Sequence, residues 1–156
     1  MSKVSIIVAD SSDYKSLEAM CLNTRLVLTT AGPFGKYGSS LVEACAVNGT
    51  NYCDITGESD WVREMIDKYD SVARVSGAKL VHFCGHDCIP WDLLVLELSK
   101  SLKGRQDTIL EVHFYDEIRS APSGGTMATV FHAMGNRTQY KSKCGFDPLV
   151  MTTVGE

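Results

Sequence analysis

The sequence carries no strong excess of charge and no long apolar run. Its 15 basic and 19 acidic residues leave a formal net charge of −4, so the composition offers no electrostatic attraction for a nucleic acid or an anionic membrane. No apolar run approaches the roughly 20 residues that cross a bilayer, and the first residues lack the basic and apolar regions of a secretory signal. We therefore expect a cytoplasmic protein with no membrane span and no nucleic-acid partner.

The sequence also lacks any Cys-x-x-Cys pair, although it contains six cysteines. Most of them lie within apolar helix or strand patterns, where a buried, reduced thiol is the ordinary state. Four residues that could bind zinc alternate in one stretch: His82, Cys84, His86 and Cys88. Alternate residues of a strand lie roughly 6.5 to 7 Å apart, so these side chains spread along a line instead of closing a tetrahedron. We predict no metal site.

The apolar residues that are present predict an α/β fold built on a parallel sheet. Short continuous apolar runs alternate with stretches of helical spacing, and strands covered on both faces have this pattern. Right-handed crossovers between such strands would order them sequentially in one sheet. The predicted strands are residues 4–9, 25–30, 52–55 and 79–83.

Capping residues mark the helices between these strands. Ser12 or Asp13 can accept the first free N–H groups of one helix, and Gly49 and Gly77 suit the left-handed ends of the next two. The third helix has an apolar stripe that predicts core packing. Pro90 suits the first turn of a fourth helix, whose many apolar residues predict that it is largely buried.

A change of rhythm near residue 107 predicts a second domain. Residues 108–115 alternate apolar and polar side chains, which is typical of a strand with one face in water. We therefore assign residues 1–106 to the domain of the parallel sheet and residues 107–156 to the beginning of a second α+β domain.

A glycine-rich turn between the second strand and the next helix is the best candidate for a ligand site. Gly32, Gly35 and Gly38 form a G-x-x-G-x-x-G run, and Asp54 follows at about the distance of the acid that meets the ribose in a dinucleotide fingerprint. Pro33, however, has no N–H to donate to a phosphate. Phe34 and Tyr37 also place large side chains where a phosphate needs bare backbone, so the turn is a poor phosphate cradle.

Three segments of the sequence resemble one enzyme family: AGPFGKYG at 31–38, VEACAVNGTNYCDITGE at 42–58 and GHDCIPWDLL at 85–94. In order and spacing they resemble the saccharopine dehydrogenase-like oxidoreductases, in the branch that includes the trans-acting enoyl reductases, and the resemblance covers residues 4–134. It implies a Rossmann-like sheet whose AGPF turn follows the fourth strand, beside the nicotinamide end of NAD or NADP. The phosphate-binding glycine loop lies earlier in that family, so we expect a fragment with an incomplete sheet.

The resemblance also implies which residues face the cofactor and the substrate. For the dinucleotide these are Asp10 near the adenine, then Ala31, Gly32, Pro33, Phe34 and Tyr37. On the substrate side they are Gly57, Glu58, Gly85, His86 and Asp87. Residues 123–129 resemble the opening of a helix in a second, substrate-side domain that forms a homodimer.

The resemblance implies hydride transfer to or from an unknown small or lipid-like substrate. Because the cofactor itself donates or accepts the hydride, no catalytic acid or base is assigned to the protein. One alternative is a non-catalytic binding module that keeps the scaffold. Another is a cysteine-dependent enzyme in which Cys84 or Cys88 is activated by His86, a residue that replaces an apolar one of the family.

Overall fold

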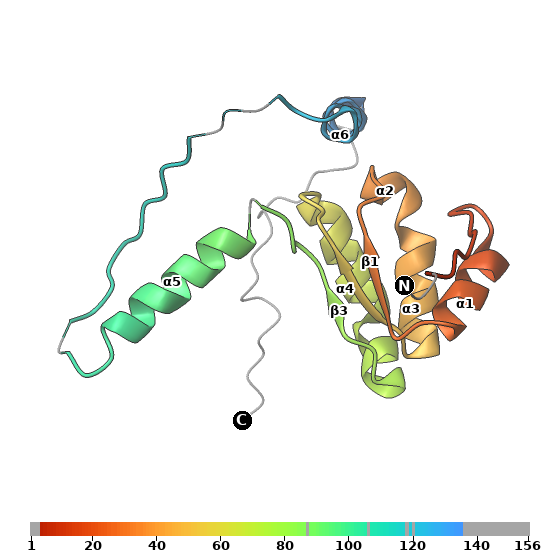
Figure 1. Ribbon diagram of the computed structural model, residues 1–156, viewed down its shortest axis with the longest axis horizontal. Helices are drawn as coiled ribbons and strands as arrows, with labels where there is room; N and C mark the ends of the chain where they lie inside the picture. Colours follow the sequence, from red (N-terminus) through yellow and green to blue (C-terminus); the bar gives the residue numbers. More distant parts are fainter. Residues whose placement is uncertain (1–3, 87, 106, 118, 120, 136–156) are drawn as a thin grey trace.

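The computed structural model describes residues 4–86, 88–105, 107–117, 119 and 121–135 and has a mixed α/β fold (Figure 1). Its sheet has three parallel strands in the order β1-β2-β3. The predicted class, an incomplete Rossmann-like parallel sheet, is therefore confirmed. The elements are α1 (Tyr14–Leu22), β1 (Leu26–Thr29), α2 (Phe34–Tyr37), α3 (Ser39–Asn48), β2 (Asn51–Asp54), α4 (Ser59–Ser76), β3 (Leu80–Val81), α5 (Ile89–Ser101) and α6 (Gly124–Gly135).

The core lies between one face of the sheet and three helices. Helix α3 packs against both α1 and α4, and its residues Val42, Ala44 and Cys45 are fully buried. The apolar stripe of α4 contributes Trp61 and Met65 to the same core, as the helical spacing predicts. Tyr52 of β2 projects into this core with no exposed surface. The covered face therefore carries the alternate residues of each strand.

The other face of the sheet is open in the described part of the chain. Leu26 and Leu28 of β1 are 52% and 67% exposed, although their apolar character predicts cover on both faces. Helix α5 stands apart from the sheet in Figure 1, and none of its residues is buried. The prediction that this helix is largely buried is wrong, because its sequence shows that it is apolar but not which surface covers it.

The predicted capping residues are confirmed at four helix ends. The Asp13 carboxylate accepts the N–H of Lys15 at 3.1 Å and caps α1. Gly49 and Gly77 end α3 and α4 with φ of 70° and 82°, the left-handed conformation that glycine adopts without strain. Pro90 lies in the first turn of α5. Local chemistry therefore fixes where these helices begin and end.

Two predicted strands are absent from the described residues. Residues 4–9 form no strand, and Val4 and Ile6 are 88% and 89% exposed. Residues 108–115 also form no strand, and Leu110 is 93% exposed. A strand is stable only when its N–H and C=O groups pair with a neighbour, and neither segment has one among the described residues.

The described helices include none that is both long and apolar enough to span a membrane. The boundary between two domains at residue 107 stays a prediction. Helix α6 begins where residues 123–129 predict a helix, and Ser123 Oγ accepts the N–H of Thr126 at 3.2 Å at its start.

Candidate functional site

The carboxyl ends of the three strands meet at one edge of the sheet, which is where open α/β sheets bind ligands. Asp54 ends β2 and is fully buried. Its carboxylate accepts hydrogen bonds from the Tyr52 hydroxyl at 2.9 Å and from His82 Nδ1 at 2.7 Å. It also accepts the backbone N–H groups of Thr56 at 3.1 Å and Phe83 at 3.2 Å. One side chain thus joins the loops that follow β2 and β3.

This arrangement decides the protonation of Tyr52 and the role of Asp54. Burial, and then the neighbouring Asp54 carboxylate, raise the pKa of the Tyr52 hydroxyl, so Tyr52 stays a donor. The rings of Tyr52 and Trp61 lie 5.5 Å and 5.4 Å from the His82 ring, centroid to centroid. Asp54 therefore cannot meet a ribose as the fingerprint spacing suggested, because its carboxylate is enclosed and saturated with donors.

Glu58 makes the corresponding connection to the turn after β1. Its Oε1 accepts the N–H of Phe34 at 2.7 Å, and its Oε2 accepts the N–H of Gly35 at 3.0 Å. The backbone of Glu58 is held in turn, because its N–H donates to Thr56 Oγ1 at 3.0 Å. A continuous chain of hydrogen bonds therefore runs from Asp54 through Thr56 and Glu58 to the glycine-rich turn.

The glycine-rich turn has no backbone N–H left for a phosphate. Each N–H of residues 31–38 has an acceptor within the protein, and Pro33 has no N–H. The acceptors are Thr29 Oγ1 for Ala31, Thr30 O for Gly32, Glu58 for Phe34 and Gly35, Pro33 O for Lys36 and Tyr37, and Phe34 O for Gly38. The prediction that this turn is a poor phosphate cradle thus gains a direct structural reason.

Packing explains the last glycine of the run. A Cβ added to Gly38 would lie 2.8 Å from the carbonyl oxygen of Phe34 and 2.8 Å from Trp61 Cζ2. The Phe34 and Trp61 rings pack with centroids 5.9 Å apart, and Trp61 Nε1 donates to Ser39 Oγ at 3.0 Å. Close packing against Phe34 and Trp61 therefore requires glycine at position 38.

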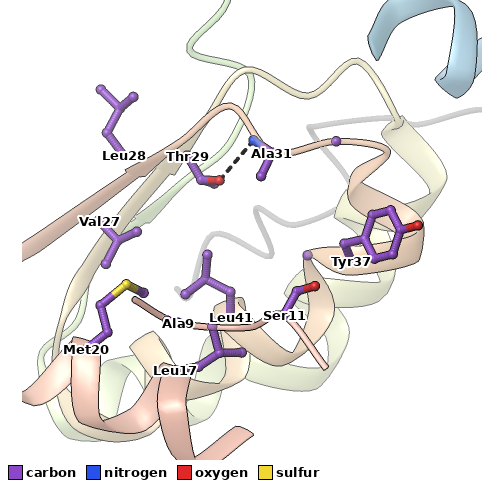
Figure 2. A pocket seen from close by; sticks show the side chains of 12 residues that line it. Ala9, Ser11, Leu17, Met20, Val27, Leu28, Thr29, Ala31, Tyr37 and Leu41 are labelled. Atoms are coloured by element: carbon purple, nitrogen blue, oxygen red, sulfur yellow. Dashed lines mark hydrogen bonds between the residues drawn. The ribbon is translucent and has the colours of Figure 1, made fainter. Parts of the chain in front are cut away.

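A cavity of about 380 Å³ opens beside β1, and we call it the β1 cavity (Figure 2). Figure 2 shows Met20 and Val27 at one end of the lining, Tyr37 at the other and Leu41 between them. Of the residues predicted to face the cofactor, three line this cavity: Ala31, Gly32 and Tyr37. Its lining is mainly apolar, which suits a ring system better than a charged group.

A second cavity of about 250 Å³ lies between the strand ends and α6, and we call it the α6 cavity. It combines apolar side chains with hydroxyl groups and the Glu58 carboxylate. Gly32 lines both cavities, so the two cavities adjoin at the turn after β1. The α6 cavity is lined by Thr30, Gly32, Phe34, Ile55, Gly57, Glu58, Ser123, Gly125, Thr126, Thr129 and Val130.

The other residues predicted to face the cofactor lie away from the β1 cavity or at its rim. Pro33 and Phe34 are buried, and Phe34 lines the α6 cavity instead. Asp10 is exposed between Ala9 and Ser11, which both line the β1 cavity. Its carboxylate accepts the N–H of Ser12 at 2.8 Å and so shapes the turn before α1.

The substrate-side residues fall into two groups. Gly57 and Glu58 line the α6 cavity. Gly85 packs against Ile55, another residue of that cavity, whereas His86 lies further out, with Nε2 3.4 Å from an oxygen of Asp116 and its ring near Trp91. Asp87 lies outside the described residues. The structure therefore brings Gly57, Glu58 and Gly85 toward one cavity, whose lining does not include His86.

The geometry around Cys84 does not favour a reactive thiol. Burial is the main cause that raises the pKa of Cys84, and its Sγ lies 3.5 Å from the carbonyl oxygen of Val81. A nucleophilic cysteine needs a lowered pKa. No group of three or more His, Cys, Asp or Glu side chains in the described ranges is arranged to hold a metal ion.

Sequence reasoning missed the hydrogen-bond network itself. The available signal was polar residues on the buried side of apolar strands: Tyr52 and Asp54 alternate in β2, and His82 follows β3. A buried polar side chain requires hydrogen-bond partners, so the alternation of Tyr52 and Asp54 indicates a polar partner at the neighbouring strand.

The fold and the site together define an α/β protein with ligand-sized cavities at the carboxyl ends of a parallel sheet. No family model and no solved structure matches the chain. Trans-acting enoyl reductases of Mycobacterium tuberculosis and Mycobacterium bovis are each 37% identical to it over 155 residues, which cover 95% of this chain and 37% of theirs. One from Mycobacterium leprae is 40% identical over 134 residues, covering 83% and 32%.

The chain is thus similar to proteins named as oxidoreductases, and it spans about a third of the length of the curated relatives it matches. These relatives support the resemblance to trans-acting enoyl reductases that the three sequence segments indicate.

Proposed function

We propose that the chain is part of an NAD- or NADP-dependent oxidoreductase of the saccharopine dehydrogenase-like type. It would transfer a hydride to or from a small or lipid-like substrate. The observation that carries the proposal is that Gly32 lines both cavities at the carboxyl end of β1. A cofactor ring in one cavity and a substrate in the other would meet at this glycine, which has no side chain to hold the hydride donor and acceptor carbons apart. The names of the relatives support the same reaction class.

Only one end of the dinucleotide fits the glycine-rich turn. The pyrophosphate does not fit there, because the N–H groups of residues 31–38 are already bonded within the protein. A nicotinamide ring fits better, because it is planar and uncharged when reduced and the cavity wall at Ala31 and Gly32 is apolar. When bound, NADH or NADPH supplies the hydride. We assign Asp10, beside the same cavity, to the adenine side.

The α6 cavity is the proposed substrate side. Glu58 and Gly57 come from the loop after β2, and Thr126 and Thr129 come from α6, so residues on both sides of position 107 form it. This fits the assignment of residues 107–156 to a substrate-side domain. A homodimer and a cytoplasmic location belong to the same proposal and stay predictions.

The first experiment is a titration of the purified chain with NADH and NADPH, followed by tryptophan quenching and nicotinamide fluorescence. We expect saturable binding of at least one reduced dinucleotide. Absence of binding up to millimolar concentration would refute cofactor recognition by this chain.

The substrate side is tested by filling the α6 cavity. A Cβ on Gly57 meets nothing within 4 Å, so Gly57→Val adds apolar bulk to the cavity lining at a position where a Cβ has room. We expect it to abolish NADPH-dependent reduction of a short enoyl thioester while dinucleotide affinity stays within about twofold. The control is Gly124→Val, because Gly124 also has open space around its Cβ position but does not line the cavity. Equal losses in both variants, or none in Gly57→Val, would contradict the assignment.

A non-catalytic binding module is the second candidate. The observation that favours it is the sealed turn, in which all N–H groups of residues 31–38 are satisfied without a ligand. Such a module would keep both cavities but bind neither reduced dinucleotide, so the same titration separates the two candidates.

A further inference from the structure

Glu58 lines the α6 cavity, yet its carboxylate is engaged on both oxygens. Oε1 accepts the N–H of Phe34 at 2.7 Å and Oε2 that of Gly35 at 3.0 Å. Bonds from N–H groups to a carboxylate are among the stronger hydrogen bonds of proteins. A side chain held in this way fixes the backbone that it bonds.

The bonded backbone belongs to the turn at which the two cavities adjoin. Phe34 and Gly35 follow Gly32 after Pro33 in the same turn, and Phe34 is buried with its ring against Trp61. With no acceptor for these two N–H groups, the turn would lose its hydrogen bonds to the loop after β2 and keep those to Thr29 and Thr30, together with the packing of the buried Pro33 and Phe34. The position of Gly32 between the cavities therefore depends on Glu58.

Glu58 is itself located by groups that line neither cavity. Its N–H donates to Thr56 Oγ1 at 3.0 Å, and the N–H of Thr56 donates to the buried Asp54 carboxylate at 3.1 Å. Thr56 is 3% exposed and is not among the cavity-lining residues. A change at Thr56 can therefore reach the turn only through Glu58 or through the backbone between them.

We infer that Glu58 is a positioning residue, which holds the turn after β1 so that Gly32 stays where the cofactor ring and the substrate meet. The inference rests on the proposed function. It changes the expectation for Glu58, which acts through the backbone N–H groups of Phe34 and Gly35 and not by contact with the substrate. The nicotinamide end of the dinucleotide should depend on Glu58, whereas the adenine end, assigned near Asp10, should not.

The test compares two probes, NADPH and ADP-ribose, which lacks the nicotinamide. Glu58→Gln replaces one accepting oxygen by an NH₂ group that faces an N–H donor. We expect the Kd for NADPH to rise by about tenfold or more and the Kd for ADP-ribose to stay within about twofold. Thr56→Val should shift the NADPH affinity in the same direction by a smaller factor. The control is Glu64→Gln on the exposed side of α4, which should leave both affinities unchanged.

Two outcomes of this comparison would overturn the inference. If Glu58→Gln weakens NADPH and ADP-ribose equally, the residue supports the fold in general and does not position the turn. If Glu58→Gln weakens NADPH but Thr56→Val behaves like the wild-type chain, Glu58 contacts the ligand directly.

Amide hydrogen exchange tests the inference even where no ligand binds. We expect the Phe34 and Gly35 amides to exchange at least about tenfold faster in Glu58→Gln, and moderately faster in Thr56→Val, while the amides of α3 keep their wild-type rates. If the wild-type chain binds neither probe, the proposed function fails and the exchange rates alone decide the role of Glu58. Unchanged protection of Phe34 and Gly35 in Glu58→Gln would overturn it.

Discussion

Removal of the Asp54 carboxylate should cost more stability than any change on the surface of this protein. Asp54 and Tyr52 have no exposed surface, and Thr56 is 3% exposed. In Asp54→Ala the Tyr52 hydroxyl, His82 Nδ1 and the N–H groups of Thr56 and Phe83 all lose their acceptor. Each unsatisfied buried donor costs about 1 to 3 kcal/mol, but relaxation and water entry reduce the sum. We expect a loss of about 4 kcal/mol, within the range for breaking a buried charged cluster.

Asp54→Asn separates charge from shape. The amide oxygen can still accept the N–H groups of Thr56 and Phe83, and the amide NH₂ can donate to the Tyr52 oxygen or to a neutral His82 ring. Only the charge assistance and part of the geometry are lost, so we expect about 1 to 2 kcal/mol. Asp70→Asn is the matched control, because Asp70 pairs with Arg74 on the exposed face of α4. Exposed pairs of this kind contribute less than about 1 kcal/mol.

Urea unfolding followed by tryptophan fluorescence measures these free energies, because Trp61 packs against His82. Thermal unfolding should agree, with a fall in Tm of about 2 to 4 °C for each kcal/mol in a chain of this size. The essential result is the order of the stability losses, which should be largest for Asp54→Ala, smaller for Asp54→Asn and smallest for Asp70→Asn. An Asp54→Ala variant within about 1 kcal/mol of wild type would show that the buried network contributes little, and the reasoning from unsatisfied donors would be refuted.

Two further predictions concern side chains whose pKa is raised. Cys84 should react with iodoacetamide at pH 7 more slowly than free cysteine, because burial raises its pKa. The substitution His86→Ala should leave this rate unchanged. Rapid alkylation that depends on His86 would instead support the cysteine-dependent enzyme. Burial, together with the Glu43 carboxylate, raises the pKa of Tyr69 to about 12. The unfolded tyrosine ionises first, near pH 10, so this contribution to the unfolding free energy is complete below pH 10 and is lost between about pH 10 and 12. Denaturation at several pH values should show a smaller alkaline loss in Tyr69→Phe, whereas an identical loss would contradict the assignment.

The local parts of this fold were readable from the sequence because their causes are local. Asp13 can cap only the helix that follows it, and Gly77 ends α4 because its φ of 82° is strained for other residues. The spacing of Trp61 and Met65 identifies the buried side of α4 without knowledge of its partner. Each of these predictions depends on residues within a few turns of chain.

The predictions that failed required a partner surface. Residues 4–9 have the apolar pattern of a buried strand, but the pattern does not contain the neighbouring ladder that a strand needs. The apolar side chains of α5 likewise indicate burial without indicating against what. Glu58 shows the same limit at the site: its type and place suggested a ligand contact, but its partners, Phe34 and Gly35, lie on another segment of the chain.

The short β3 illustrates how the network shapes the site edge of the sheet. The ladder between β2 and β3 ends at Val81, and Phe83 then adopts a φ of 61°, which is unusual for a large side chain. The Phe83 N–H bonds the Asp54 side chain, and the Cys84 N–H bonds the Asp54 carbonyl oxygen at 2.8 Å. The Asp54 carboxylate thus takes the place of the next backbone hydrogen bond between β2 and β3 and stabilises the strained conformation of Phe83. Because the chain turns there, Gly85 comes to lie against Ile55 of the α6 cavity, so the residue that completes the core also places the substrate-side loop.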